Sequence, residues 1–250
     1  KFEFRMLGSS ASIAGCNIVL NTAIADELKQ FADVLEKAPD FTSALHALIQ
    51  GTIKEHKQII FNGNGYDESW VEEAQKRGLL NLKTTPDALP YFIKENNIEL
   101  FKRHHVLDEE EVTSRYEIMM EEYVKVLNIE ALTMVDMANK LIIPATVKYT
   151  KELADTVLAV KEAGVDATIQ AEMLADATAK LAEMKKAVKN LSEVTEKAAN
   201  AGDAKAVAVA YKDEVMEAMA ELRKPADELE VVMPKEEWPM PTYGDLVFEL

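Results

Sequence analysis

The chain has 250 residues, which is enough for one large domain or two small ones with a hydrophobic core. Its formal net charge is −16, and so acidic a surface repels phosphate backbones and anionic lipids, which excludes nucleic acid and membranes as expected partners. Hydrophobic residues make up 48% of the chain and aromatic residues only 7%, a mixture that favours helices over sheets.

A short β-strand is predicted at the start of the chain. Phe2, Phe4 and Met6 alternate with Glu3 and Arg5, which is the period of a half-buried strand. No second strand pattern follows, and a lone strand leaves its backbone hydrogen-bonding groups unpaired. We therefore expect its partner strands to come from another chain or from sequence outside this one, as in a fragment of a larger protein.

Helical periodicity follows as far as residue 143. Apolar residues recur at every third or fourth position, and Asn, Asp, Thr and Pro residues mark the expected starts. The predicted helices begin near Asn17 or Asn21, Thr42, Asp67, Thr85, Asn96 or Asn97, and Asp108. The apolar face expected for the first helix consists of Leu20, Ile24, Leu28, Phe31 and Leu35. Pro144 is expected to break or kink the last of these helices, because proline lacks the backbone N–H group.

The composition changes after this proline. Heptad-like apolar repeats separated by short connectors at 164–166 and 201–203 predict a three-helix antiparallel bundle over residues 146–232. Residues 233–250 are rich in proline and aromatic residues and are predicted to form an extended tail. The expected fold class is therefore mainly α: a multi-helix array with this bundle, plus one short N-terminal strand left from a larger catalytic α+β domain that includes residues 1–145.

Glu3 and Arg5 are the strongest candidates for chemistry. They project from one face of the predicted strand, with backbones roughly 6–7 Å apart. A carboxylate can bind Mg²⁺ or Mn²⁺, and a guanidinium can stabilise a phosphoryl group during its transfer. An ordinary polar sheet face is the alternative, and the short spacing alone favours that alternative.

The other polar candidates favour structural roles. None of the four histidines has a glutamate three residues before it, so a di-iron helical site is not indicated. We interpret His46, His56, His104 and His105 as solvated or capping residues. Cys16, the one cysteine, excludes an internal disulfide, fits a reducing cytoplasm and is interpreted as structural.

Several motifs follow one another in a specific order. They are K-F-E-F-R-M at 1–6, then G-S-S-A-S and N-I-V-L-N-T; K-E-H-K-Q-I-I-F-N-G-N-G-Y at 54–66; R-G-L-L-N-L-K-T-T-P-D-A-L-P at 77–90; S-R-Y-E-I at 114–118; N-I-E-A-L-T-M-V-D-M-A at 128–138; and W-P-M-P-T-Y at 238–243. In this order they resemble glutamine synthetase, and most closely its long type III branch. The stretch 146–232 is similar only in being helical.

This resemblance implies an ATP-dependent ligase that joins ammonia to glutamate through a γ-glutamyl phosphate. It implies that Glu3 binds one of two divalent metal ions, Mg²⁺ or Mn²⁺, and that Arg5 contacts the reacting phosphoryl group or the substrate carboxylate. The other metal ligands and most of the ATP and glutamate sites would precede this strand, so the fragment alone is expected to be inactive. Stacked homo-oligomeric rings are also implied. The alternative function is a non-catalytic helical scaffold or interaction module.

Overall fold

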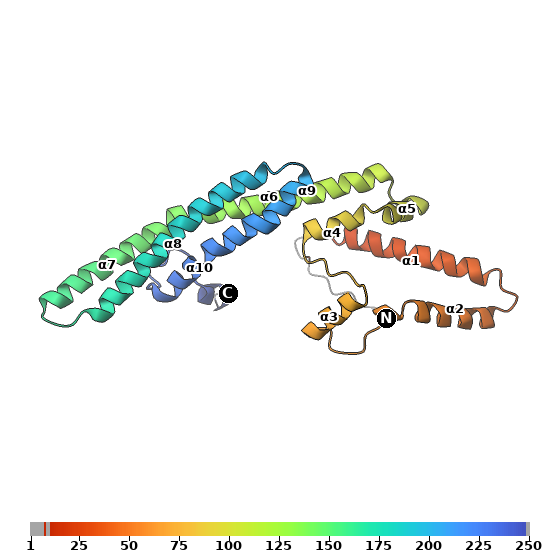
Figure 1. Ribbon diagram of the computed structural model, residues 1–250, viewed down its shortest axis with the longest axis horizontal. Coiled ribbons are helices and arrows are strands. Elements are labelled where there is room, and N and C mark those ends of the chain that lie inside the picture. The colour runs from red at the N-terminus through yellow and green to blue at the C-terminus, as the bar shows by residue number, and fades with distance from the viewer. Residues whose placement is uncertain (1–7, 9–10, 249–250) are drawn as a thin grey trace. The chain divides into compact units, whose positions relative to one another are not determined.

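The computed structural model describes residue 8 and residues 11–248, and every regular element in this part of the chain is helical (Figure 1). The prediction of a mainly helical protein is confirmed. The strand predicted at residues 2–6 lies outside the described residues. Across the described residues, no helix has both the length and the apolar character needed to cross a membrane.

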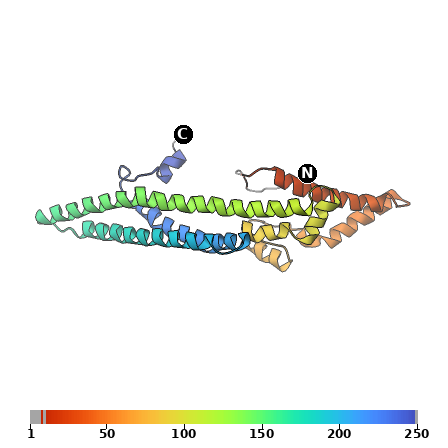
Figure 2. The same cartoon turned by 90° about the horizontal axis from the view of Figure 1, so that it is seen from above.

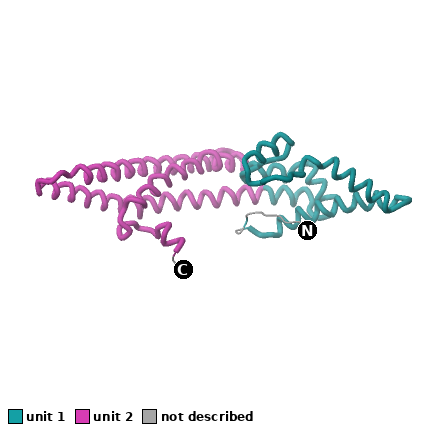
Figure 3. Tube along the Cα trace, turned by 90° about the horizontal axis from the view of Figure 1, so that it is seen from below, with its two compact units in different colours: residues 1–116 teal, residues 117–250 magenta. Residues whose placement is uncertain are grey.

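The chain divides into two compact units, Lys1–Tyr116 and Glu117–Leu250, which Figure 3 draws in different colours. Each unit has its own hydrophobic cluster, and each is described here by itself. The sequence-based domain limits at residues 145, 146 and 232 stay predictions.

The first unit contains short helices joined by capped turns. Its helices are α1 (Ala14–Leu35), α2 (Phe41–Glu55), η1 (Lys57–Ile59), α3 (Glu68–Lys76), α4 (Thr85–Phe92), α5 (Glu95–Arg103) and the start of α6 (Glu109–Met137). The Asp67 carboxylate accepts a hydrogen bond from the backbone N–H of Ser69 at 2.9 Å, so the predicted cap of α3 is confirmed. Asp108 and Glu111 form a reciprocal capping box at the start of α6, which confirms that predicted helix start as well.

The core of this unit is small. Phe101, Leu107 and Val112 are buried, and four half-buried apolar residues pack around them: Ile18, Phe92, Ile93 and Ile98. The rings of Phe92 and Phe101 meet edge to face, with centroids 5.7 Å apart. This cluster packs the first part of α1 against α4, α5 and the start of α6.

Helices α1 and α2 bury little of their own surface. Thr22 is the one buried residue of α1, and α2 has none. On the face that the sequence predicts to be apolar, Ile24 and Leu28 are exposed, whereas Phe31 and Leu35 are half-buried. A neighbouring surface of α1 makes the contacts with the region of α5: Ile18 packs on the buried cluster, and Asp26 pairs with Arg103 and His104.

The second unit is built from longer helices. After α6 come η2 (Ala138–Ile142), α7 (Ile143–Glu162), α8 (Thr168–Ala199), α9 (Ala204–Ala210), η3 (Tyr211–Val215), α10 (Met216–Val232) and α11 (Tyr243–Phe248). Both η2 and η3 are π-helical. In Figure 2 the helices α8 to α10 run alongside the helical stretch through α7.

Of the two outcomes predicted at Pro144, a break or a kink, the break is wrong, because the chain stays helical from α6 through η2 into α7. The backbone N–H of Ile143 bonds to the carbonyl of Ala138, five residues earlier, so the turn before the proline is wider than an α-helical turn. Pro144 then lies in the first turn of α7, where a missing N–H group costs least.

Helix α8 is central to the second unit, because its backbone lies along both α7 and α10. Within the described residues the backbones of α7 and α10 approach each other closely at few points. The three-helix antiparallel bundle predicted for 146–232 is therefore not confirmed, although α8 does pack on both neighbours. The core along α8 includes Met184, Val188 and Leu191, which belong to one buried cluster with Tyr211 and Leu229 from the following helices.

The residues after α10 form a tail that packs back onto the core through Met233 and Trp238. The stretch before α11 lacks regular secondary structure, whereas residues 243–248 form α11, which differs from the extended tail predicted there. The Asp245 carboxylate accepts hydrogen bonds from the backbone N–H and the hydroxyl of Thr242, at 2.9 and 2.8 Å. These bonds cap the first turn of α11. The sequence prediction missed this helix start, because the prolines and aromatic residues around it favoured an extended tail.

Candidate functional site

Glu3 and Arg5, the residues predicted to bind a metal ion and to act in catalysis, lie outside the described residues. Their roles therefore stay predictions. Among the described residues of the first unit, one cluster of charged side chains joins residues that are far apart in the sequence.

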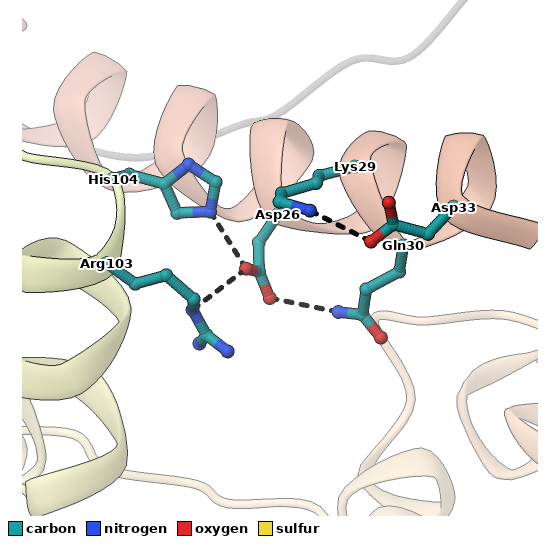
Figure 4. Close-up of polar contacts among 6 residues, drawn as sticks. All are labelled: Asp26, Lys29, Gln30, Asp33, Arg103 and His104. Atoms are coloured by element: carbon teal, nitrogen blue, oxygen red, sulfur yellow. Dashed lines mark hydrogen bonds and ion pairs between the residues drawn. The ribbon is translucent and has the colours of Figure 1, made fainter.

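This cluster centres on the carboxylate of Asp26 (Figure 4). The His104 Nε2 atom lies 2.8 Å from Asp26 Oδ1, and the Arg103 Nε atom lies 3.3 Å from the same oxygen. Gln30, one turn later on α1, donates its amide N–H to the other carboxylate oxygen at 3.0 Å. Asp26 thus connects the middle of α1 to the end of α5.

The end of α5 fixes the position of His104. The N–H of His105 bonds to the carbonyl of Lys102, and the N–H of Val106 bonds to that of Phe101, which together form a Schellman motif. His105 takes the left-handed position of that motif, with φ of 53°. His104 directly precedes this turn, and its ring is held against α1. Its side chain is 16% exposed, so the solvated alternative is wrong for this histidine. The residue occupies the C-cap position of α5, where its backbone N–H bonds to the last carbonyls of the helix.

The charges of the cluster act on the ionisation of Asp26. The hydrogen bond from His104 lowers the pKa of the Asp26 carboxyl, and the positive charge of Arg103 and the hydrogen bond from Gln30 lower it further. Partial burial of Asp26 opposes this shift. Asp26 is therefore a stable anion that holds two side chains from the end of α5.

A His–Asp pair can orient an imidazole for general base catalysis, but that chemistry also needs a reacting group nearby. The described partners of Asp26 are an imidazole, a guanidinium and an amide, with no hydroxyl or thiol among them. Among the described residues, no three His, Cys, Asp or Glu side chains form a group able to hold a metal ion. The cluster is thus a structural connection between α1 and α5, and sequence reasoning missed it because its members are 78 residues apart.

Arg77 makes a second long-range connection, between two of the motifs described above. Its guanidinium donates hydrogen bonds to the backbone carbonyls of Gln58 and Ile60, at 3.3 and 3.0 Å. It also lies 5.5 Å from the ring of Trp70, which stacks on Phe61. The stretch 54–66 is thereby held against the start of the stretch 77–90.

The remaining candidates show no built site. Cys16 is exposed and free on α1. A shallow hollow of about 380 Å³ is lined by His46, Ile49, Gln50, Ile53 and Lys54, all from α2. Because these residues share one face of a single helix, the hollow has no opposing wall and does not enclose a ligand.

Comparisons with known proteins identify the family. Residues 44–161 match the family model described as the glutamine synthetase C-terminal domain. The chain is 39% identical to a glutamine synthetase of Butyrivibrio fibrisolvens over 95% of this chain and 32% of that protein. It is 31% identical to the type-3 glutamine synthetase of Dictyostelium discoideum and 28% identical to a glutamine synthetase of Bacteroides fragilis, each over 99% of this chain and 35% of the relative.

The chain thus spans about a third of the length of these curated relatives. The similarity runs along nearly all of the chain, including the 146–232 stretch where no specific motif stands out in the sequence. The chain belongs to the glutamine synthetase family.

Proposed function

We propose that this chain supplies part of a type III glutamine synthetase, an ATP-dependent ligase that forms glutamine from glutamate and ammonia through a γ-glutamyl phosphate. One observation carries the proposal: 39% identity to a glutamine synthetase along 95% of this chain. The name type-3 of a second relative supports the branch that the motifs resemble.

Glu3 is proposed as a ligand of Mg²⁺ or Mn²⁺, and Arg5 as the contact of the reacting phosphoryl group or substrate carboxylate. The described residues do not by themselves fit a metal centre, since no suitable group of side chains gathers among them. Further ligands and the ATP site would come from the rest of the protein, and the isolated chain would be inactive. The described helices would act as scaffold, in a cytoplasmic homo-oligomer of stacked rings.

A chimaera tests this proposal. The matching third of the Butyrivibrio fibrisolvens glutamine synthetase is replaced by residues 1–250 of this chain, and glutamine formation from glutamate, ammonia and ATP is measured. The proposal predicts ATP-dependent turnover by the chimaera and none by the isolated chain. Turnover by the isolated chain would contradict the proposal that it is inactive alone.

The alternative, a non-catalytic helical scaffold, predicts a different outcome. The chimaera would then assemble and show normal helicity by circular dichroism, but it would form no glutamine. The parent enzyme, rebuilt with its own third through the same junction sequences, is the positive control, because it shows that the junction sequences leave the activity intact.

A further inference from the structure

The C-terminal tail, residues 233–248, is held against α7 by buried and polar contacts within the second unit. Met233 and Trp238 are buried in the core. The Tyr149 hydroxyl donates a hydrogen bond to the backbone carbonyl of Val232 at 3.3 Å, directly before the tail. The tail also places Glu237, next to Trp238, against α7.

Glu237 meets a second carboxylate there. The Lys148 Nζ atom lies 3.8 Å from Glu237 Oε1 and 3.6 Å from Glu152 Oε1, so a single ammonium faces two carboxylates. The Lys148 side chain is exposed, whereas that of Glu237 is 12% exposed. Glu237 Oε2 is buried and has no hydrogen-bond donor among the described residues.

An ionised Glu237 has too few donors in this position, because Lys148 also faces Glu152 and Glu237 Oε2 has no donor among the described residues. A proton on Glu237 removes this charge and turns its carboxyl into a hydrogen-bond donor. In agreement, interaction with Glu152 raises the pKa of Glu237, burial raises it further, and Lys148 opposes the shift. The charged and titratable groups that act on Glu237 are thus Glu152, Lys148 and Tyr149, all on α7.

We propose that Glu237 carries a proton where it meets Lys148 and Glu152, and that this carboxyl is a pH-sensitive latch that holds the tail on α7 and loosens as the proton is lost. The direction follows from linkage. A group with a raised pKa in the folded state stabilises that state fully below its unfolded pKa and loses this contribution as pH rises through the folded pKa. The latch is therefore closed in mild acid and opens toward alkaline pH.

A neighbouring feature makes the tail easier to release. The Trp238 indole Nε1 is buried without an acceptor among the described residues, so attachment of the tail leaves a polar group unsatisfied. The tail is further joined to α10 by the backbone N–H of Tyr243, which donates to Glu230 at 2.8 Å, and Lys235 pairs with Asp245 inside the tail. These contacts do not include Glu237 and would keep α11 near α10 when the latch opens.

Trp238 fluorescence reports the latch. The chain has two tryptophans, so a Trp70→Phe background leaves Trp238 as the sole emitter. The 250-residue chain in this background is titrated from about pH 5 to 9, and the proposal predicts a red shift of emission with rising pH. Glu237→Gln keeps the side-chain shape, donates an N–H to Glu152 and cannot ionise, so its emission should stay blue-shifted throughout. Glu162→Gln, an exposed change on the same helix, is the matched control and should leave the shift unchanged.

Trypsin cleavage after Lys235 provides a second readout. Between the ordinary glutamate pKa of the open tail and the raised pKa of the closed latch, cleavage of the wild-type chain should rise by up to about tenfold per pH unit relative to Glu237→Gln at the same pH. Above that range it should level off, because both states have then lost the proton. Direct ¹³C NMR titration of the Glu237 carboxyl in the wild-type chain keeps the test independent of any variant that fails to fold. An ordinary or lowered pKa for Glu237, or a red shift that persists in Glu237→Gln, would overturn the proposal.

Discussion

Truncation of Leu191 measures how much the second unit depends on α8. Leu191 is fully buried in the core of the second unit, where α8 packs on α7 and α10. Leu191→Ala removes three buried carbon atoms, or roughly 2.4 kcal/mol at about 0.8 kcal/mol for each. The cavity that remains adds to this loss, so we expect a total decrease of about 3–5 kcal/mol in the free energy of unfolding.

Urea denaturation followed by Trp238 fluorescence, in the Trp70→Phe background, reports this unit alone. The matched control is Leu158→Ala on α7, where the leucine is 61% exposed, and we expect a change within about 0.5 kcal/mol. Equal midpoint shifts for the two variants would show that α8 is not the central packing element. A change in the denaturant slope would instead indicate that the unit no longer unfolds in one step.

Three further predictions concern polar contacts. Asp26→Asn should lower the protection of the α1 amides against hydrogen exchange at neutral pH, measured relative to their intrinsic exchange rates. In the wild-type chain this protection should also fall as pH drops through the lowered pKa of Asp26, because its contribution is lost on protonation. Unchanged protection factors would exclude the connection to α5. The hydrogen bond from Lys235 is the main cause that lowers the pKa of the Asp245 carboxyl to about 2. The NMR signals of α11 should therefore persist at pH 4 and disappear near pH 2, because the cap is lost on protonation. Loss of these signals already at pH 4 would refute the cap. Tyr211→Phe removes the 2.9 Å hydrogen bond to Asn128 and should lower the free energy of unfolding by about 1 kcal/mol, with no further loss when Asn128→Ala is added.

Local signals in the sequence predicted much of the helical fold. Asp67 and Asp108 were predicted to cap helices from their position before apolar repeats, and both side chains accept backbone N–H groups in the structure. A cap depends on residues two or three positions away, which is within the reach of pattern reasoning. The family resemblance, which rests on ordered motifs, is confirmed by the comparisons.

Other features depended on contacts that no local pattern contains. Pro144 was expected to break or kink a helix, but the chain stays helical through it, with a π-turn directly before the proline. Asp26 and His104 are far apart in the sequence, as are Glu152 and Glu237, so neither pair was visible before the fold. Glu3 and Arg5 lie outside the described residues, and their roles still rest on the resemblance.

The two residues of the predicted strand give the most direct test of the proposed function. In the active chimaera, Glu3→Ala should lower glutamine formation by more than about 100-fold, because a metal ligand is lost. Arg5→Ala should lower the turnover number by roughly 100- to 1,000-fold, as expected for a group that stabilises transition-state charge. Glu172→Ala, an exposed change on α8, should retain full activity. Full activity of both Glu3→Ala and Arg5→Ala would contradict the proposed part of this chain in the ligase reaction.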